Sequence, residues 1–135
     1  MKSRSELIKP GFKSVIDNGR NHTITADLPS SQGGTDVAAT ALEIMVMSLS
    51  GCITTIFAVV AQNSNISFQR ITVDLDAEKG KEPIEKVHAD VTVISCETEE
   101  KIKRILEKTM KTCPVGILFE KAGISVSFTL KCQNS

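Results

Sequence analysis

The alternation of hydrophobic and polar residues predicts several short strands in this chain. Asn18-Gly19 separates the first two, and this dipeptide is typical of the tight turn of a β-hairpin. In the second half, apolar side chains recur at every other position in three stretches, which is the pattern of half-buried strands. A turn-rich segment between the first two of these stretches predicts another antiparallel hairpin. The five predicted strands are residues 12–17, 22–28, 71–77, 87–93 and 124–130.

A long apolar segment predicts a helix over residues 37–62, with Asp36 as its N-cap. Glu43 is the only charged residue between positions 37 and 69, so this helix is apolar on all sides. Such a helix lies either at the centre of a protein or in a membrane, and the 18 uncharged residues 44–61 reach the lower limit of a membrane span. Interspersed Ser, Thr and Gly residues and the lack of flanking Lys or Arg clusters favour the core of a protein. Because a small domain has few ways to surround a whole helix, a dimer that covers it from both sides is favoured.

Residues 97–112 predict an amphipathic helix. Acidic residues gather at its start, which suits the helix dipole, and its polar face carries charge pairs in the favourable i,i+4 order. Cys113 lies seven residues beyond Leu106 and continues the buried stripe, and Pro114 is suited to begin a short further helix with Cys113 as its N-cap. The predicted stripe is Ile102, Ile105, Leu106 and Met110, and the predicted pairs are Glu97–Lys101, Glu99–Lys103, Glu100–Arg104 and Glu107–Lys111.

The order of these elements predicts an α+β fold, with a mostly antiparallel sheet and the helices packed on it. At 135 residues the chain is expected to form one domain, residues 1–135, which is long enough to bury a core. Lys+Arg and Asp+Glu both number 16, and this formal net charge of zero argues against nucleic acid or an acidic membrane as a partner. The first residues lack the apolar stretch of a signal peptide, so a cytoplasmic location is expected.

Four cysteines are the candidate chemical groups: Cys52, Cys96, Cys113 and Cys132. None forms a Cys-x-x-Cys arrangement, and His22 and His88 are isolated, so a zinc site finds little support. A thiol attacks a peroxide, a disulfide or a carbonyl as its thiolate. The helix start predicted beyond Cys113 is expected to lower the pKa of that thiol. Cys96 and Cys132 have no activating context and are interpreted as bystanders.

Cys52, inside the apolar helix, has no activating group in its own segment. A cation from elsewhere in the chain would be needed, and the sequence leaves its identity open. Free cysteine is among the most buried residue types, so the alternative is that Cys52 is a small core residue without chemistry. The candidate cations are Arg4, Arg20, Arg70 and Arg104.

Four short motifs together resemble the OsmC/Ohr family, and most closely its broader OsmC-like branch. They are Gly33-Gly34-Thr35, Leu42-Glu43-Ile44, Leu49-Ser50-Gly51-Cys52 and Thr112-Cys113-Pro114-Val115. Their order and spacing agree with the family over about residues 20–130. The resemblance implies an OsmC-like α+β fold and an intertwined homodimer, with a long buried central helix in each subunit and a thiol site at the subunit interface.

The resemblance also implies a function, which is the thiol-dependent reduction of organic hydroperoxides in an antioxidant stress response. Cys52 would be the peroxidatic thiol, and its sulfenic acid would condense with Cys113, the resolving thiol, to a disulfide. A small dithiol of the lipoyl kind would then reduce the disulfide. The resemblance implies no metal, haem or flavin.

Two further residues are carried over from this resemblance, because the best-characterised peroxidases of the family place an Arg and a Glu around the reactive thiol. Glu43 stands one position later than their Glu, and nine residues of helix put it about half a turn round and ~13 Å along from Cys52. It is therefore expected to serve the partner's thiol, or to be a helix-start acid favoured by the dipole. Arg20, beside the first hairpin turn, is the candidate cation, with a plain surface role as its alternative. The Pro-x-Glu usual before the helix is absent, and Ala39-Thr40-Ala41 stands there.

Three functions remain open from the sequence. The first is a peroxidase for organic hydroperoxides, whose apolar lining would favour an apolar peroxide; the residues of that lining are Met45, Met47, Leu49, Ile53 and Ile56. The second is a non-catalytic protein that binds an apolar ligand in a cavity between subunits. The third is a redox sensor in which the same disulfide alters the binding of a partner.

Overall fold

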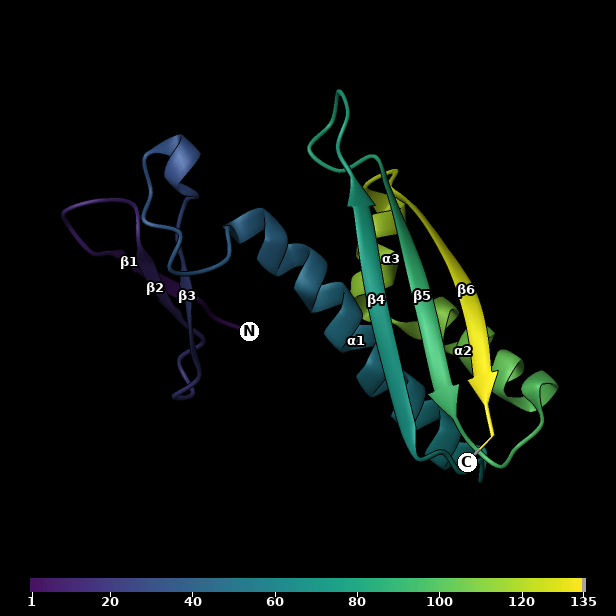
Figure 1. Ribbon diagram of the computed structural model, residues 1–135. Coiled ribbons are helices and arrows are strands. Elements are labelled where there is room, and N and C mark those ends of the chain that lie inside the picture. The colour runs from purple at the N-terminus through teal and green to yellow at the C-terminus, as the bar shows by residue number, and fades with distance from the viewer. Residues whose placement is uncertain (135) are drawn as a thin grey trace. The chain divides into compact units, whose positions relative to one another are not determined.

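The computed structural model describes residues 1–134, which form two compact units. Unit 1 comprises residues 1–45 and unit 2 begins at Val46, so the boundary falls within the first turns of the long helix α1 (Ala41–Asn63). Figure 1 shows the strands and helices of each unit. The expectation of one domain over residues 1–135, whose last residue lies outside the described part, stays a prediction.

Unit 1 contains a small antiparallel sheet of β1 (Arg4–Leu7), β2 (Ser14–Asp17) and β3 (Thr23–Ala26), in the order β1-β2-β3. The predicted hairpin at Asn18-Gly19 joins β2 to β3. Gly19 has φ +73°, a left-handed conformation that glycine adopts without strain, and its N–H donates a hydrogen bond of 2.8 Å to Asp17 Oδ1. The sequence pattern does not predict β1, because its four residues show no alternation of apolar and polar side chains, and all four are exposed.

The loop after β3 is organised by a buried carboxylate, that of Asp27. It accepts hydrogen bonds from the hydroxyl of Thr35 at 2.7 Å, from the N–H of Thr35 at 3.1 Å and from the N–H of Leu28 at 2.8 Å. These bonds, chiefly that from the Thr35 hydroxyl, lower the pKa of Asp27 from 3.8 to about 2. Inside this loop, a Cβ on Gly34 would lie 1.9 Å from the carbonyl oxygen of Leu28. Packing of the loop therefore accounts for Gly34 and Thr35 of the Gly-Gly-Thr motif.

Because its folded-state pKa is lowered, Asp27 contributes stability that is fully present above about pH 4 and is lost as the pH falls towards about 2. We expect Asp27→Asn to destabilise unit 1 at neutral pH and to flatten its stability between about pH 4 and pH 2. Chemical denaturation monitored by NMR signals of β2 and β3 measures both effects. The matched control is Asp36→Asn, which neutralises an exposed acid of the same loop; an equal loss of acid dependence in the two variants would contradict this role of Asp27.

The predicted N-cap at Asp36 is wrong. A capping box formed by Thr40 and Glu43 fixes the start of α1 instead. Thr40 Oγ1 accepts from the N–H of Glu43 at 3.2 Å, and Glu43 Oε2 accepts from the N–H of Thr40 at 2.7 Å and from its hydroxyl at 2.8 Å. Asp36 has φ +56°, and its N–H donates to Leu28 O within the preceding loop. The helix therefore begins at Ala41, four residues later than predicted.

One side of α1 is buried, and the other carries exposed apolar side chains. The buried residues are Leu49, Ile53, Phe57, Val60 and Ala61. Met45, Met47 and Val59 are 50%, 59% and 49% exposed. By length and composition alone this helix could cross a membrane, but core helices of soluble proteins share these properties.

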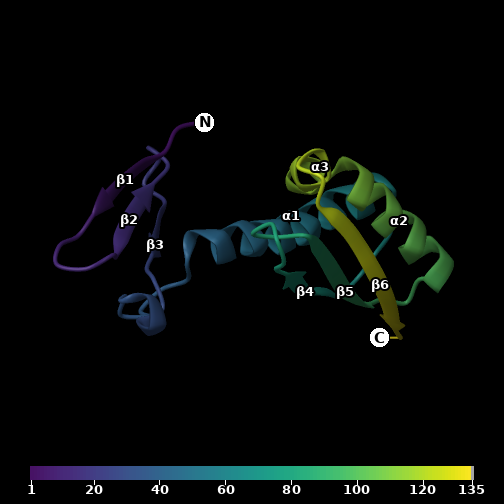
Figure 2. The ribbon, with the colours of Figure 1, turned by 90° about the horizontal axis from the view of Figure 1, so that it is seen from above.

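Unit 2 is built on a second three-stranded sheet, with strands β4 (Arg70–Glu78), β5 (Lys86–Ile94) and β6 (Ser125–Gln133) in the order β4-β5-β6. The predicted antiparallel hairpin of β4 and β5 is confirmed. β6 pairs parallel to β5, and the crossover that a parallel pair requires runs through α2 (Glu99–Thr112) and α3 (Pro114–Lys121). Figure 2 shows these two helices and the later turns of α1 over the same face of the sheet.

The core of unit 2 lies between this sheet and the helices. Val87, Ala89, Val91 and Val93 point inward from β5, as the alternation predicted, and the ring of Phe57 meets that of Phe68 edge-on at a centroid distance of 5.2 Å. In α2 the stripe is Ile102, Ile105, Leu106 and Thr109, whereas Met110, predicted to be buried, is half-buried. Thr109 can take its place because its hydroxyl donates to Ile105 O at 2.8 Å.

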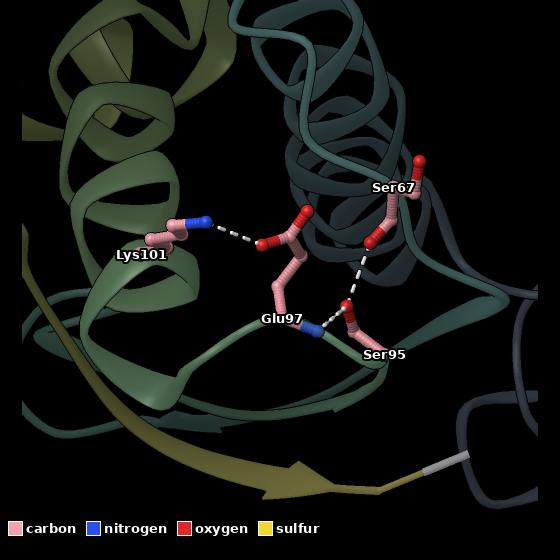
Figure 3. Close-up of polar contacts among 4 residues, drawn as sticks. All are labelled: Ser67, Ser95, Glu97 and Lys101. Atoms are coloured by element: carbon pink, nitrogen blue, oxygen red, sulfur yellow. Dashed lines mark hydrogen bonds and ion pairs between the residues drawn. The ribbon is translucent and has the colours of Figure 1, made fainter.

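A polar cluster ties the loop before α2 to the segment after α1 (Figure 3). The hydroxyl of Ser95 donates to Ser67 O at 2.6 Å and accepts from the N–H of Glu97 at 3.0 Å. Lys101 Nζ lies 2.8 Å from Glu97 Oε2 and, ahead of its other contacts, lowers the pKa of Glu97. The predicted Glu97–Lys101 pair is thus confirmed, as is the pair of Glu100 and Arg104 at 2.5 Å.

Candidate functional site

The structure brings Cys52 and Cys113 together in unit 2, although 61 residues separate them in the chain. Cys52 comes from α1, and Cys113 lies between α2 and α3. The thiol of Cys113 donates a hydrogen bond to Cys52 Sγ across 2.8 Å. Cys113 is fully buried, whereas Cys52 is half-buried. Both are free thiols, so the pair is a reduced dithiol in which one sulfur is accessible and the other is enclosed.

The position of Cys113 follows from its place at two helix ends. Its N–H donates to Thr109 O at 2.8 Å and closes α2, and its extended backbone, with φ −63° and ψ 112°, makes it the N-cap of α3. Pro114 occupies the first turn of α3, where its missing N–H costs nothing. The N–H of Gly116 donates to Cys113 Sγ at 3.4 Å. The predicted N-cap at Cys113 is therefore confirmed.

The prediction that the pKa of Cys113 is lowered is wrong. Burial, followed by the hydrogen bond to Cys52, raises the pKa of the Cys113 thiol from 9.0 to about 11. The hydrogen bond from Gly116, which acts at the helix start as the sequence suggested, lowers the pKa but is outweighed. The cost of removing a thiolate from water therefore exceeds the gain from one helix terminus. At neutral pH Cys113 remains an S–H donor, and Cys52 is its acceptor.

The surroundings of Cys52 are apolar on the inner side of α1 and open on the outer side. Leu49 and Ile53, its neighbours on the helix, are fully buried, while the Cβ position of Gly51 faces open space beyond its own stretch of helix. The hydroxyl of Thr55 donates to Gly51 O at 2.9 Å and to Cys52 O at 3.1 Å. Of the predicted apolar lining, Met45 and Met47 are exposed and Ile56 is half-buried. Cys52 is thus reached from solvent along an apolar helix surface.

Glu43 and Arg20 belong to unit 1, and their predicted roles remain predictions. The carboxylate of Glu43 is held in the capping box with Thr40, the helix-start role that was its alternative. Arg20 lies in the hairpin turn between β2 and β3, exposed, and lines an open cavity of about 700 Å³ with Lys2 and Asn18. Two of the other candidate cations are paired with acids, Arg4 with Glu6 at 3.7 Å and Arg104 with Glu100.

The remaining cysteines and the histidines are placed as follows. Cys96 is exposed in the loop after β5, and Cys132 is half-buried on β6, where burial raises its pKa. His88 is on β5 and bonds Ser127 at 2.8 Å, and His22 bonds Asn18 at 3.0 Å. Within residues 1–134, no group of three or more His, Cys, Asp or Glu side chains is arranged to hold a metal ion.

Two features of local importance are not predicted from the sequence. The capping box of Thr40 and Glu43 had a visible signal, the T-x-x-E pattern. Gly116 has no visible signal in the sequence, because a glycine at the third position of a short helix indicates only a low helix propensity. Its contact with the Cys113 thiol exists only once α3 is packed in place.

The fold and the paired thiols define an α+β protein with a partly buried dithiol, a class suited to cysteine redox chemistry. The model of the OsmC-like protein family matches residues 33–129. The chain belongs to this family, as its motifs indicated.

Solved structures of other OsmC/Ohr proteins share the fold at low sequence identity. An OsmC-like protein from Mycoplasma pneumoniae superposes with a TM-score of 0.85 at 13% identity, over 97% of this chain and 95% of its own. An organic hydroperoxide resistance protein OsmC from Legionella pneumophila superposes with a TM-score of 0.74 at 10% identity, over 96% of this chain and 95% of its own. An organic hydroperoxide resistance protein from Elizabethkingia anophelis, with thiocyanate bound, superposes with a TM-score of 0.75 at 15% identity, over 97% of this chain and 94% of its own. No curated protein matches the sequence.

Proposed function

We propose that this chain is a thiol-dependent peroxidase that reduces organic hydroperoxides. The observation that carries the proposal is the contact of 2.8 Å between Cys52 Sγ and Cys113 Sγ. Family membership and the similarity to organic hydroperoxide resistance proteins support a redox role that concerns peroxides. The two thiols supply the groups that such chemistry needs.

In the first step, the Cys52 thiolate attacks the terminal oxygen of the hydroperoxide. The O–O bond breaks, Cys52 becomes a sulfenic acid, and the alkoxide takes up a proton and leaves as an alcohol. Cys52 is assigned this step because it is the accessible sulfur, while Cys113 is fully buried and remains protonated. The hydrogen bond from Cys113 points at the sulfur that must carry negative charge. The exposed apolar side chains of Met45 and Met47 support an apolar peroxide as substrate.

In the second step, the sulfur of Cys113 attacks the sulfur of the Cys52 sulfenic acid. A disulfide forms, and the hydroxyl group leaves with the Cys113 proton as water. Two contributions that raise the pKa of Cys113, its hydrogen bond to Cys52 and the Cys52 charge, are specific to the reduced pair. Oxidation of Cys52 removes both, while burial, the largest cause, still raises the pKa of Cys113. The first step therefore weakens, but does not abolish, the effects that keep Cys113 protonated.

A third step returns the disulfide to the dithiol at the expense of a small external dithiol, of the lipoyl kind, which becomes a cyclic disulfide. We propose in addition that the protein acts in the cytoplasm and as a homodimer. The exposed apolar side chains on α1, among them Met47 and Val59, support a second copy that covers this helix. Arg20 and Glu43 are proposed as auxiliary groups around the Cys52 thiol.

Peptide mapping by non-reducing mass spectrometry, after one equivalent of cumene hydroperoxide, tests the proposal. We expect a dominant Cys52–Cys113 cross-link that is absent before treatment, because the two sulfurs are already in contact. Consumption of the peroxide should match the amount of cross-link. Free Cys52 and Cys113 with the peroxide unconsumed would contradict the proposal and favour a protein that binds an apolar ligand. A cross-link that forms without turnover when a dithiol is supplied would favour a redox sensor.

A further inference from the structure

Gly116 contacts the thiol site and has no part in the chemistry proposed above. It occupies the third position of α3 and is buried. A Cβ on Gly116 would lie 3.5 Å from Cys113 Cβ, 3.6 Å from Cys113 Sγ and 3.8 Å from Leu49 Cδ1. The φ of Gly116 is not in the left-handed region, so the backbone itself does not require glycine. Glycine is the least favourable residue in a helix after proline, and the contacts around its Cβ position leave room for only a small side chain.

We propose that Gly116 is a positioning residue that sets the separation of the two thiols. Leu49 stands three residues before Cys52 on α1, and Gly116 stands three residues after Cys113. Gly116 therefore faces both Leu49 and the cysteine that must reach Cys52. A side chain no larger than a methyl group at this position lets α3 approach α1 until Cys113 Sγ is 2.8 Å from Cys52 Sγ. The expected effect of Gly116 on peroxidase turnover rests on the proposed function, whereas its effect on the distance between the two sulfurs does not.

The space at Gly116 defines a size limit. An alanine fits, because distances of 3.5–3.8 Å are ordinary van der Waals contacts. A valine does not, because each of its γ-methyl groups extends about 1.5 Å beyond Cβ and the helix holds the side chain in one rotamer. Leu49 is fully buried and has little freedom to retreat. The extra volume must then move α3 and Cys113 away from α1.

Such a displacement affects the rates of the two chemical steps differently. The attack of Cys52 on the peroxide involves neither Cys113 nor Gly116 as a reactant, so it should slow only as far as it depends on the hydrogen bond from Cys113. The condensation, in which the Cys113 sulfur displaces the hydroxyl group from Cys52 as water, depends on the distance between the sulfurs. A displacement of about 1 Å slows a step of this kind on the order of 100-fold.

The experiment compares Gly116→Ala and Gly116→Val in a chain that also carries Cys96→Ser and Cys132→Ser. Quenched-flow mass spectrometry after cumene hydroperoxide follows the Cys52 sulfenic acid, trapped by dimedone, and the Cys52–Cys113 disulfide. In Gly116→Val we expect disulfide formation to slow far more than sulfenic acid formation, and in Gly116→Ala we expect neither rate to change. The control is Leu118→Val, which places the same branched side chain at a position of α3 that is 65% exposed. Equal disulfide rates in all variants would overturn the proposal, as would equal slowing in the control.

An equilibrium measurement keeps the test independent of peroxidase activity. Exchange of the Cys52–Cys113 disulfide with dithiothreitol yields the protein dithiol and cyclic dithiothreitol disulfide, and their ratio reports how readily the two sulfurs meet. We expect this ratio to shift towards the protein dithiol on the order of 100-fold in Gly116→Val, because a disulfide forced from its preferred geometry is more readily reduced, and to stay unchanged in Gly116→Ala. If Gly116→Val fails to fold, Gly116→Ser gives the intermediate size, and a shift no greater than that of alanine overturns the proposal. If the parent chain consumes no peroxide, the proposed function fails while this equilibrium still decides the role of Gly116.

Discussion

Cys52→Ser is expected to abolish the consumption of organic hydroperoxide. The variant retains Cys113, but that thiol is fully buried and its pKa is raised to about 11, so it presents almost no thiolate to a peroxide at neutral pH. Loss of the nucleophile in an enzyme of covalent catalysis costs on the order of 10⁶-fold in turnover. We expect the rate with a dithiol reductant to fall to that of protein-free buffer. A coupled assay that follows cumene hydroperoxide directly measures the loss.

The fold of this variant and a matched cysteine change serve as controls. Serine is close in size to cysteine, and the backbone of α1 around Cys52 is held by the hydroxyls of Thr54 and Thr55, so the thermal melting curve should be nearly unchanged. Cys132→Ser, which alters a half-buried thiol on β6, should retain full peroxide consumption. Equal activity in Cys52→Ser and the parent chain would exclude Cys52 as the peroxidatic thiol.

Periodicity predicted most of the regular structure, because each element of unit 2 is buried on one side. The alternation in β4, β5 and β6 and the stripe in α2 record which side chains face the core. The predictions failed where local hydrogen bonds decide the structure. The apolar run after Asp36 predicts a cap at that residue, yet Thr40 and Glu43 form the reciprocal bonds of a capping box.

The thiol pair shows a different limit of prediction. Motifs that resemble a family indicated Cys52 and Cys113, and spacing placed Cys113 on the buried side of α2. The pKa of Cys113 was predicted in the wrong direction, because a sequence displays the helix start but not the depth of burial. Arg20 and Glu43 could not be assigned from spacing at all, since their roles depend on which side chains a folded chain, or its partner, brings to Cys52.

Cys113→Ser is expected to retain the first chemical step and to lose the second. Serine is a favourable N-cap residue, so it can replace the thiol at the start of α3 and accept the bond from the Gly116 N–H that Cys113 Sγ accepts now. The variant should consume about one equivalent of peroxide per subunit and stop at the Cys52 sulfenic acid, because no second thiol is in contact with Cys52. Steady-state turnover with a dithiol should fall well below that of the parent chain. Mass spectrometry of the intact protein distinguishes the sulfenic acid from the disulfide.

Exposure to excess peroxide gives this prediction its sharpest outcome. In the parent chain, disulfide formation removes the sulfenic acid before a second peroxide reaches it, since Cys113 Sγ is already 2.8 Å from Cys52 Sγ. In Cys113→Ser the half-buried Cys52 remains accessible and should proceed to sulfinic acid, which is not reduced by dithiols. Inactivation that rises with peroxide concentration in the variant, and hardly at all in the parent chain, would thus assign Cys113 as the resolving thiol. Full turnover by the variant, with Cys52 undamaged, would mean that the external dithiol reduces Cys52 directly and that the contact between the two thiols serves the reduced fold alone.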